Sequence, residues 1–166
     1  MKRVPLSLFT FLFLLSGLCA APTKTVWQIG EKNHSASELA LSPDKYKEFL
    51  ANDFGWEDRF YIIGLSSPQK DFPYVLPGPA DHWGGTSYTA GIRTHVLNIL
   101  FGMKEVPETD SWKLIIDLLD THHELPALFK ITINGKSWKY ALPKGSGKSI
   151  DGDYSQIKPH TIEIPL

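Results

Sequence analysis

The sequence predicts an all-β fold, an antiparallel β-sandwich with one short helix, and two observations support this. Seven segments rich in aliphatic, β-branched and aromatic residues recur along the chain, most of them with apolar side chains alternating on one face. Glycine, proline and other turn-forming residues separate these segments, and only one stretch carries a helix signal. Short strands joined by turns are typical of a sandwich.

In the first half of the chain, two predicted strands flank the helix signal. Residues 25–29 form a short β-prone run, and residues 59–65 form an apolar run that predicts a buried strand. Between them, Ser42 is suited to cap a helix and Pro43 to occupy its first position. One face of this helix would carry Tyr46, Phe49 and Leu50.

The second half of the chain carries the other five predicted strands. Residues 93–101 have apolar side chains on both faces, which predicts a strand covered on both sides. Asn134 and Gly135 tolerate positive φ, so they predict the two-residue turn of a β-hairpin. The five strands are expected at 93–101, 112–119, 128–133, 136–142 and 160–166.

The N-terminus has the build of a secretory signal peptide. A basic start, Lys2 and Arg3, is followed by an apolar run over residues 6–15 that is too short to span a membrane, and then by small residues. We expect residues 1–21 to be a signal peptide and residues 22–166 to form one β-sandwich module, secreted or periplasmic. A retained membrane anchor, or a lipid attached to Cys19, is the less favoured alternative.

Composition excludes several function classes for residues 22–166. They carry 15 basic and 18 acidic residues, a formal net charge of −3, and no cysteine. Without cysteine there is no disulfide, zinc-thiolate site or cysteine nucleophile. A mildly acidic chain without a Lys/Arg run argues against nucleic acid and anionic membrane as partners. A secreted chain without disulfides fits bacterial export.

One long loop carries the predicted binding site. Residues 66–91 contain four prolines and four glycines, and a loop of this length in a compact domain is usually functional. Pyranose faces stack on Trp and Tyr rings, while carboxylates and imidazoles hydrogen-bond sugar hydroxyls. The loop offers these groups together, and we predict a carbohydrate-binding site made of Asp81, His82, Trp83 and Tyr88.

The same loop permits two other interpretations. A polysaccharide lyase needs a base for the proton α to the uronate carboxyl group and a cation to neutralise that carboxylate. His82 with Arg93 or Lys70 has this chemistry, but no spacing rule selects these residues, so no catalytic residue is assigned. In the other interpretation, Trp83 simply fills one end of the sandwich.

Two acidic clusters invite a metal, and for both the simpler interpretation is preferred. His122 and His123, with the carboxylates around them, resemble a metal site, but neighbouring side chains on an extended chain point in opposite directions. Asp151 and Asp153 flank a glycine and have the ligand chemistry of a structural calcium site, yet this is also ordinary turn chemistry. We therefore expect no cofactor, with structural calcium as the alternative, and leave the metal content open.

Five segments, taken in order, resemble a known family. They are similar to the N-terminal module of bacterial rhamnogalacturonan lyase-like polysaccharide-degrading proteins, over roughly residues 25–166. The resemblance implies a galactose-binding-like jelly roll, similar to the β-sandwich third domain of rhamnogalacturonan lyases. The segments are Trp27-Gln-Ile-Gly30, Phe54-Gly-Trp-Glu-Asp-Arg59, Tyr74-Val-Leu-Pro-Gly-Pro-Ala-Asp81, Trp83-Gly-Gly-Thr86 and His95-Val-Leu-Asn-Ile-Leu-Phe101.

The resemblance also implies strands that this sequence lacks. In such modules, further strands follow a segment like residues 161–166 and close the sandwich, whereas here the sequence ends at Leu166. We interpret the chain as the N-terminal piece of a longer enzyme or as a truncated gene product.

The function expected from the resemblance is that of a secreted carbohydrate-binding or accessory module of a polysaccharide-degrading enzyme. Its expected partners are a polysaccharide or oligosaccharide, pectic in type, and a downstream catalytic domain. One alternative is a catalytic contributor to a polysaccharide lyase or glycosidase, inactive alone. Another is a scaffold that touches no sugar.

Overall fold

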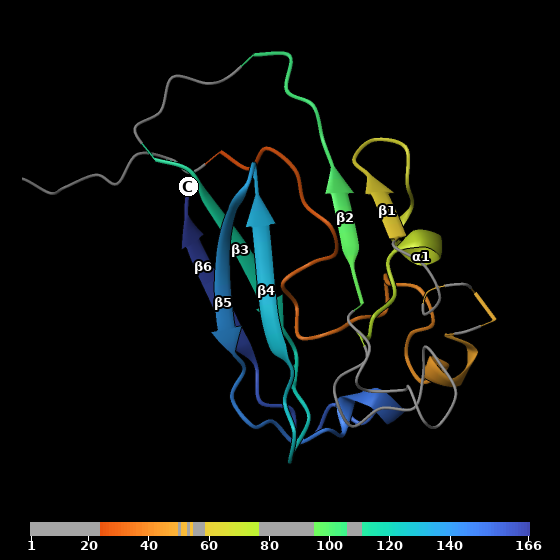
Figure 1. Cartoon of the computed structure of the whole chain (residues 1–166). Coiled ribbons are helices and arrows are strands. Elements are labelled where there is room, and N and C mark those ends of the chain that lie inside the picture. Colours follow the sequence, from red (N-terminus) through yellow and green to blue (C-terminus); the bar gives the residue numbers. More distant parts are fainter. Residues whose placement is uncertain (1–23, 50, 53, 55–58, 77–94, 106–110) are drawn as a thin grey trace, which may run out of the picture.

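The computed structural model describes residues 24–49, 51–52, 54, 59–76, 95–105 and 111–166 (Figure 1). Strands dominate this part of the chain, which confirms the predicted all-β class. The strands are β1 (Arg59–Ile62), β2 (Leu97–Leu100), β3 (Lys113–Leu118), β4 (Leu128–Ile133), β5 (Lys136–Ala141) and β6 (His160–Pro165). The helices are each one turn long: α1 (Pro68–Asp71) and the 3-10 turns η1 (Tyr46–Glu48) and η2 (Ser149–Asp151).

The predicted hairpin is confirmed as β4–β5. Asn134 and Gly135 have φ values of 48° and 82°, the left-handed conformation that a two-residue hairpin turn requires. The strands pair antiparallel, with Ile131 opposite Trp138. Every second side chain is partly buried, so one face of the hairpin is apolar and the other is exposed.

The strand pair β3–β6 is also antiparallel and supplies the best-buried residues of the sheets. Leu114 lies opposite Ile164, and Ile116 lies opposite Ile162. Ile162 and Ile164 are buried, as the apolar alternation in the sequence predicts. Figure 1 shows β4–β5 in front of β3–β6 as a second layer, so the apolar faces of the two pairs form the interior of the sandwich.

The remaining strands correct two predictions. β1 and β2 pair in parallel, with Arg59 opposite Leu97, whereas the sequence predicted antiparallel strands throughout. The chain between them is long enough for the crossover that parallel strands require. Both strands are shorter than predicted, and neither is covered on both sides, because Phe60 is 58% and Leu100 47% exposed.

The N-terminal region differs from its prediction as well. Residues 25–29 form no strand; Trp27 instead packs its ring against Phe101, with centroids 5.3 Å apart. The helix expected from Ser42 is reduced to η1, which begins after Lys45. The reason is tertiary: Leu41 adopts a positive φ of 66°, and the chain beyond it turns to bury Phe49.

A second apolar cluster lies under this region. Ala40, Phe49 and Phe54 are buried together, and Leu41 and Val75 pack against them. The rings of Phe49 and Phe54 lie 5.6 Å apart in a tilted arrangement.

The part of the chain that the structure describes contains no helix with the length and apolar character of a membrane span.

Candidate functional site

The predicted carbohydrate-binding residues lie outside the described part of the chain. Asp81, His82, Trp83 and Tyr88 all fall within residues 77–94, as does Arg93. They therefore stay a prediction. The candidate site that the structure does describe is built from two loops and η2. The loops are residues 119–127 between β3 and β4, and residues 142–148 between β5 and η2.

Backbone hydrogen bonds join these two loops side by side. The N–H of Gly145 donates to the carbonyl of His122 at 3.3 Å, and the N–H of Gly147 donates to the carbonyl of Thr121 at 3.1 Å. The Thr121 hydroxyl also donates to the carbonyl of Pro143. These bonds connect residues about two dozen positions apart in the sequence, so the two loops form one structural unit.

The carboxylate of Asp120 anchors this unit. Oδ1 accepts a hydrogen bond from the Ser146 N–H at 2.8 Å, and Oδ2 accepts one from the Ser146 hydroxyl. Burial alone would raise the pKa of the Asp120 carboxyl group, but hydrogen bonds from Ser146, Thr121 and Lys158 lower this pKa by more, so its net shift is downward. The ionised carboxylate therefore stabilises the folded loops.

This lowered pKa predicts a pH dependence of stability. A carboxyl group with a depressed folded-state pKa stabilises the fold above its unfolded pKa, about 3.9, and loses that contribution as the pH falls through the folded value. We expect Asp120→Asn to lower the free energy of unfolding at pH 7, and the difference from wild type to shrink below about pH 4. Urea unfolding at several pH values measures it, with Glu48→Gln as an exposed control at pH 7. A difference that stays constant down to pH 2 would contradict the assignment.

Glycine at position 145 permits the close approach of the two loops. A Cβ atom there would clash with the Asp120 carboxylate and with the backbone of Thr121. At Gly147, where φ is 69°, a Cβ would lie 3.2 Å from Nδ1 of His123. Glycine is therefore favoured at positions 145 and 147, where the loop of residues 142–148 lies against the loop of residues 119–127.

The two histidines correct another prediction. The rings of His122 and His123 stack, with centroids 4.7 Å apart and planes at 20°, so the side chains do not point in opposite directions. The chain bends at residues 123–125 instead of running extended. Nδ1 of His122 accepts hydrogen bonds from the N–H groups of Glu124 and Leu125 at 3.1 and 3.0 Å, so the neutral ring carries its proton on Nε2.

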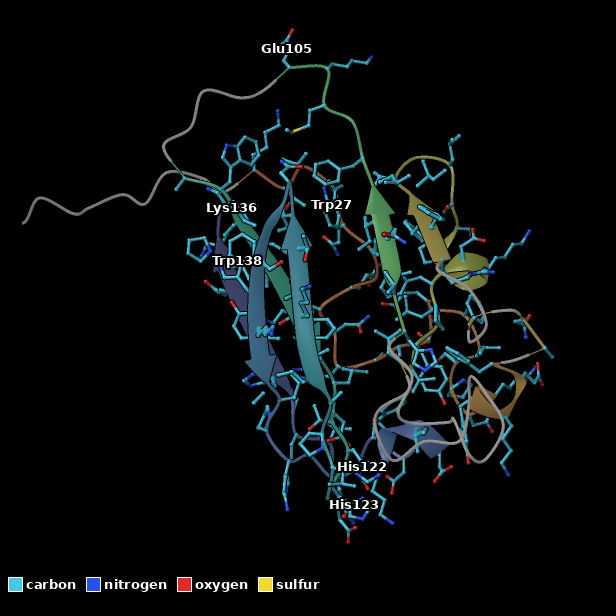
Figure 2. The ribbon with its side chains drawn as sticks, in the orientation of Figure 1. Trp27, Glu105, His122, His123, Lys136 and Trp138 are labelled. Atoms are coloured by element: carbon cyan, nitrogen blue, oxygen red, sulfur yellow. The ribbon has the colours of Figure 1, made fainter. Side chains whose placement is uncertain are left out.

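Beside the histidines lies a cavity of about 370 Å³. Its lining combines an imidazole, a hydroxyl group, an ammonium group and a carboxylate. Figure 2 shows both histidines at one end of the strand layers, with Lys136 at the other. The lining residues are His123, Ser146, Gly147, Lys148 and Asp151.

The carboxylates considered as metal ligands can be located among the described residues. The described residues contain no group of three or more His, Cys, Asp or Glu side chains placed to hold an ion. The carboxylate of Asp153, one of the two predicted calcium ligands, accepts hydrogen bonds from the backbone and hydroxyl of Ser155, which is the turn chemistry preferred from the sequence. Asp151 is the other, and it lines the cavity.

Sequence reasoning missed the cavity, although one signal was available. Residues 143–152 are rich in Gly, Ser and Lys, but small residues alone do not distinguish a site from a connection. Residues 143–152 are brought to the loop of His122 and His123 by hydrogen bonds between residues that are distant in the sequence.

A comparison with known families decides what kind of module carries this site. Residues 25–163 match the model of a family described as CBM-like: polysaccharide lyase family 4, domain III. The chain belongs to this family. It is thus an accessory, carbohydrate-related module of a polysaccharide lyase, and the resemblance stated from the sequence is confirmed. No curated protein and no solved structure matches the chain.

Membership of the CBM-like family fits the architecture described above. The matched residues include all six strands up to the last two residues of β6 and both loops of the candidate site. The family also gives the module a context, because its description places domains of this kind in polysaccharide lyases as domain III.

Proposed function

We propose that this CBM-like module binds polysaccharide for the lyase to which it belongs, after export from a bacterial cell. The observation that carries the proposal is the cavity beside His123, which offers polar groups of every kind that a sugar hydroxyl or carboxylate needs. Sugar hydroxyls both donate and accept hydrogen bonds, so an ammonium group, a carboxylate, an imidazole and a serine hydroxyl together can satisfy them.

Three features favour binding over a purely structural role. The cavity side chains come from the two loops and from η2, at one end of the sandwich, and loops held by a rigid scaffold are the common location of binding sites. Hydrogen bonds to Asp120 fix Ser146, so the site is preorganised. Lys148 and Asp151 remain exposed and therefore accessible to a ligand.

Charged cavity residues provide the test. We expect Lys148→Ala and Asp151→Asn each to weaken binding of a pectic oligosaccharide by about tenfold, since a hydrogen bond to a charged group contributes ~1.5 kcal/mol. Isothermal titration calorimetry measures the dissociation constants. The matched controls are Lys104→Ala and Asp44→Asn, which remove the same charges from exposed positions outside the cavity lining.

The same titration discriminates among the alternatives. Wild-type affinity in both cavity variants, with loss of binding in Trp83→Ala, would assign the sugar to the predicted site at residues 81–88 instead. Absence of binding by the wild-type protein would leave the module a scaffold for the catalytic domain. Release of unsaturated uronate by the chain, abolished in His82→Ala, would show that the chain supplies catalytic residues and would contradict a purely accessory role.

A further inference from the structure

The outward faces of the two sheet layers differ in charge. On β3–β6, Lys113 forms an ion pair with Glu163 at 2.9 Å, and Asp117 forms one with Lys32 at 2.9 Å. On the outward face of β4–β5, the charged side chains are Lys130 and Lys139, and neither has an ion-pair partner among the described residues. One face is therefore charge-balanced and the other carries excess positive charge.

The two unpaired lysines lie side by side. Lys130 is directly opposite Lys139 in the register of the hairpin, and both side chains are exposed. Side chains directly opposite each other on adjacent strands have Cβ atoms about 4.5–5.5 Å apart, and like charges in such a pair destabilise the sheet. The pair thus costs folding free energy, in a chain whose residues 22–166 otherwise carry an excess of acidic side chains.

A pair of hydroxyl groups lies next to the lysines on the same face. Thr132 is opposite Ser137, and their side-chain oxygens are hydrogen-bonded at 2.7 Å. One row of side chains on a strand face follows the next at about 6.6–6.8 Å. The face therefore offers two ammonium groups and two hydroxyl groups within the length of a few sugar units.

We propose that the exposed face of β4–β5 binds carboxylate groups of an acidic polysaccharide, with Lys130 and Lys139 together contacting one carboxylate. This inference rests on the proposed function and names the ligand class and a second contact surface for it. The elimination catalysed by a polysaccharide lyase requires a uronate unit, so a chain held by the module presents carboxylates. A carboxylate placed between the ammonium groups replaces their mutual repulsion with two charge-assisted hydrogen bonds.

The test replaces both lysines and distinguishes binding to the carboxylate groups of the oligosaccharide from binding to its other groups. Titrations would use an oligosaccharide containing galacturonate, and the same oligosaccharide with its carboxyl groups chemically reduced to alcohols. We expect the double variant Lys130→Gln/Lys139→Gln to bind the acidic form about tenfold more weakly than wild type, with a smaller salt dependence, and to bind the reduced form equally well. The control is Lys104→Gln/Lys113→Gln, which removes two charges elsewhere and should bind as wild type.

Thermal unfolding provides an independent readout. Because the lysine pair destabilises the hairpin, the melting temperature of the double variant should equal or exceed that of wild type by about 1–3 °C, so weaker binding would not reflect unfolding. Equal affinity of the double variant and wild type for the acidic form would overturn the inference while the proposed function stands. Absence of wild-type binding to both forms would overturn both.

Discussion

Ile164→Ala is expected to lower the free energy of unfolding by about 2–5 kcal/mol. Its side chain has no exposed surface, and it lies opposite Leu114 on the inner face of β3–β6. Truncation removes apolar contact area and leaves a cavity between two sheet layers that cannot close without moving whole strands. Denaturant unfolding monitored by tryptophan fluorescence measures the change.

Ile115→Ala is the matched control for that loss. Ile115 lies on the neighbouring strand, opposite Glu163 on the outward face, and is 47% exposed. The same truncation there should cost less than about 1 kcal/mol, because the removed atoms already contact water. Equal losses in the two variants would contradict the assignment of inner and outer faces, and with it the sandwich.

Gly145→Ala is expected to destabilise the protein by about 1–3 kcal/mol and to abolish sugar binding at the cavity. The added methyl group meets the carboxylate of Asp120 and the backbone of Thr121, neither of which moves without breaking hydrogen bonds. The two loops would separate, and the cavity depends on their contact. Unfolding curves and oligosaccharide titration together measure both effects.

Gly102→Ala is the control for this substitution. No atom lies within 4 Å of a Cβ built at Gly102, and its φ is not positive. The variant should match wild type or gain slightly in stability, because alanine reduces the entropy of the unfolded chain. A Gly145→Ala variant with wild-type stability and binding would show that the loops do not depend on their close approach.

Predictions from the sequence were best where one local pattern determines the structure. The β4–β5 hairpin follows from Asn134-Gly135 and the alternation around it, and β3 and β6 follow from strict alternation ending in the buried Ile162 and Ile164. In these elements, local propensity and burial favour the same structure.

Predictions failed where a distant contact decides the structure. Ser42 and Pro43 have helix-start chemistry, yet the helix is reduced to η1, and Phe49 packs into a cluster that includes the more distant Val75. The parallel pairing of β1 with β2 depends on a crossover that no local pattern records. Short apolar runs such as residues 25–29 do not distinguish a strand from a packed irregular segment.

The candidate site also depends on contacts that no local sequence pattern predicts. An extended backbone would separate the side chains of His122 and His123, whereas the bend at residues 123–125 allows the rings to stack. Gly145 and Gly147 were visible as small loop residues, but the bonds that join them to residues 121–122 are properties of the fold. Family membership, by contrast, could be inferred from the order of modest motifs along the chain.

The most direct test of the account is to locate a bound glycan on the protein by two-dimensional NMR. Titration of a pectic oligosaccharide into the isotopically labelled chain should shift the backbone amide signals of Ser146, Gly147, Lys148 and Asp151, and leave that of the buried Phe49 in place. Unchanged signals from the cavity residues, at oligosaccharide concentrations that saturate carbohydrate-binding modules, would contradict it.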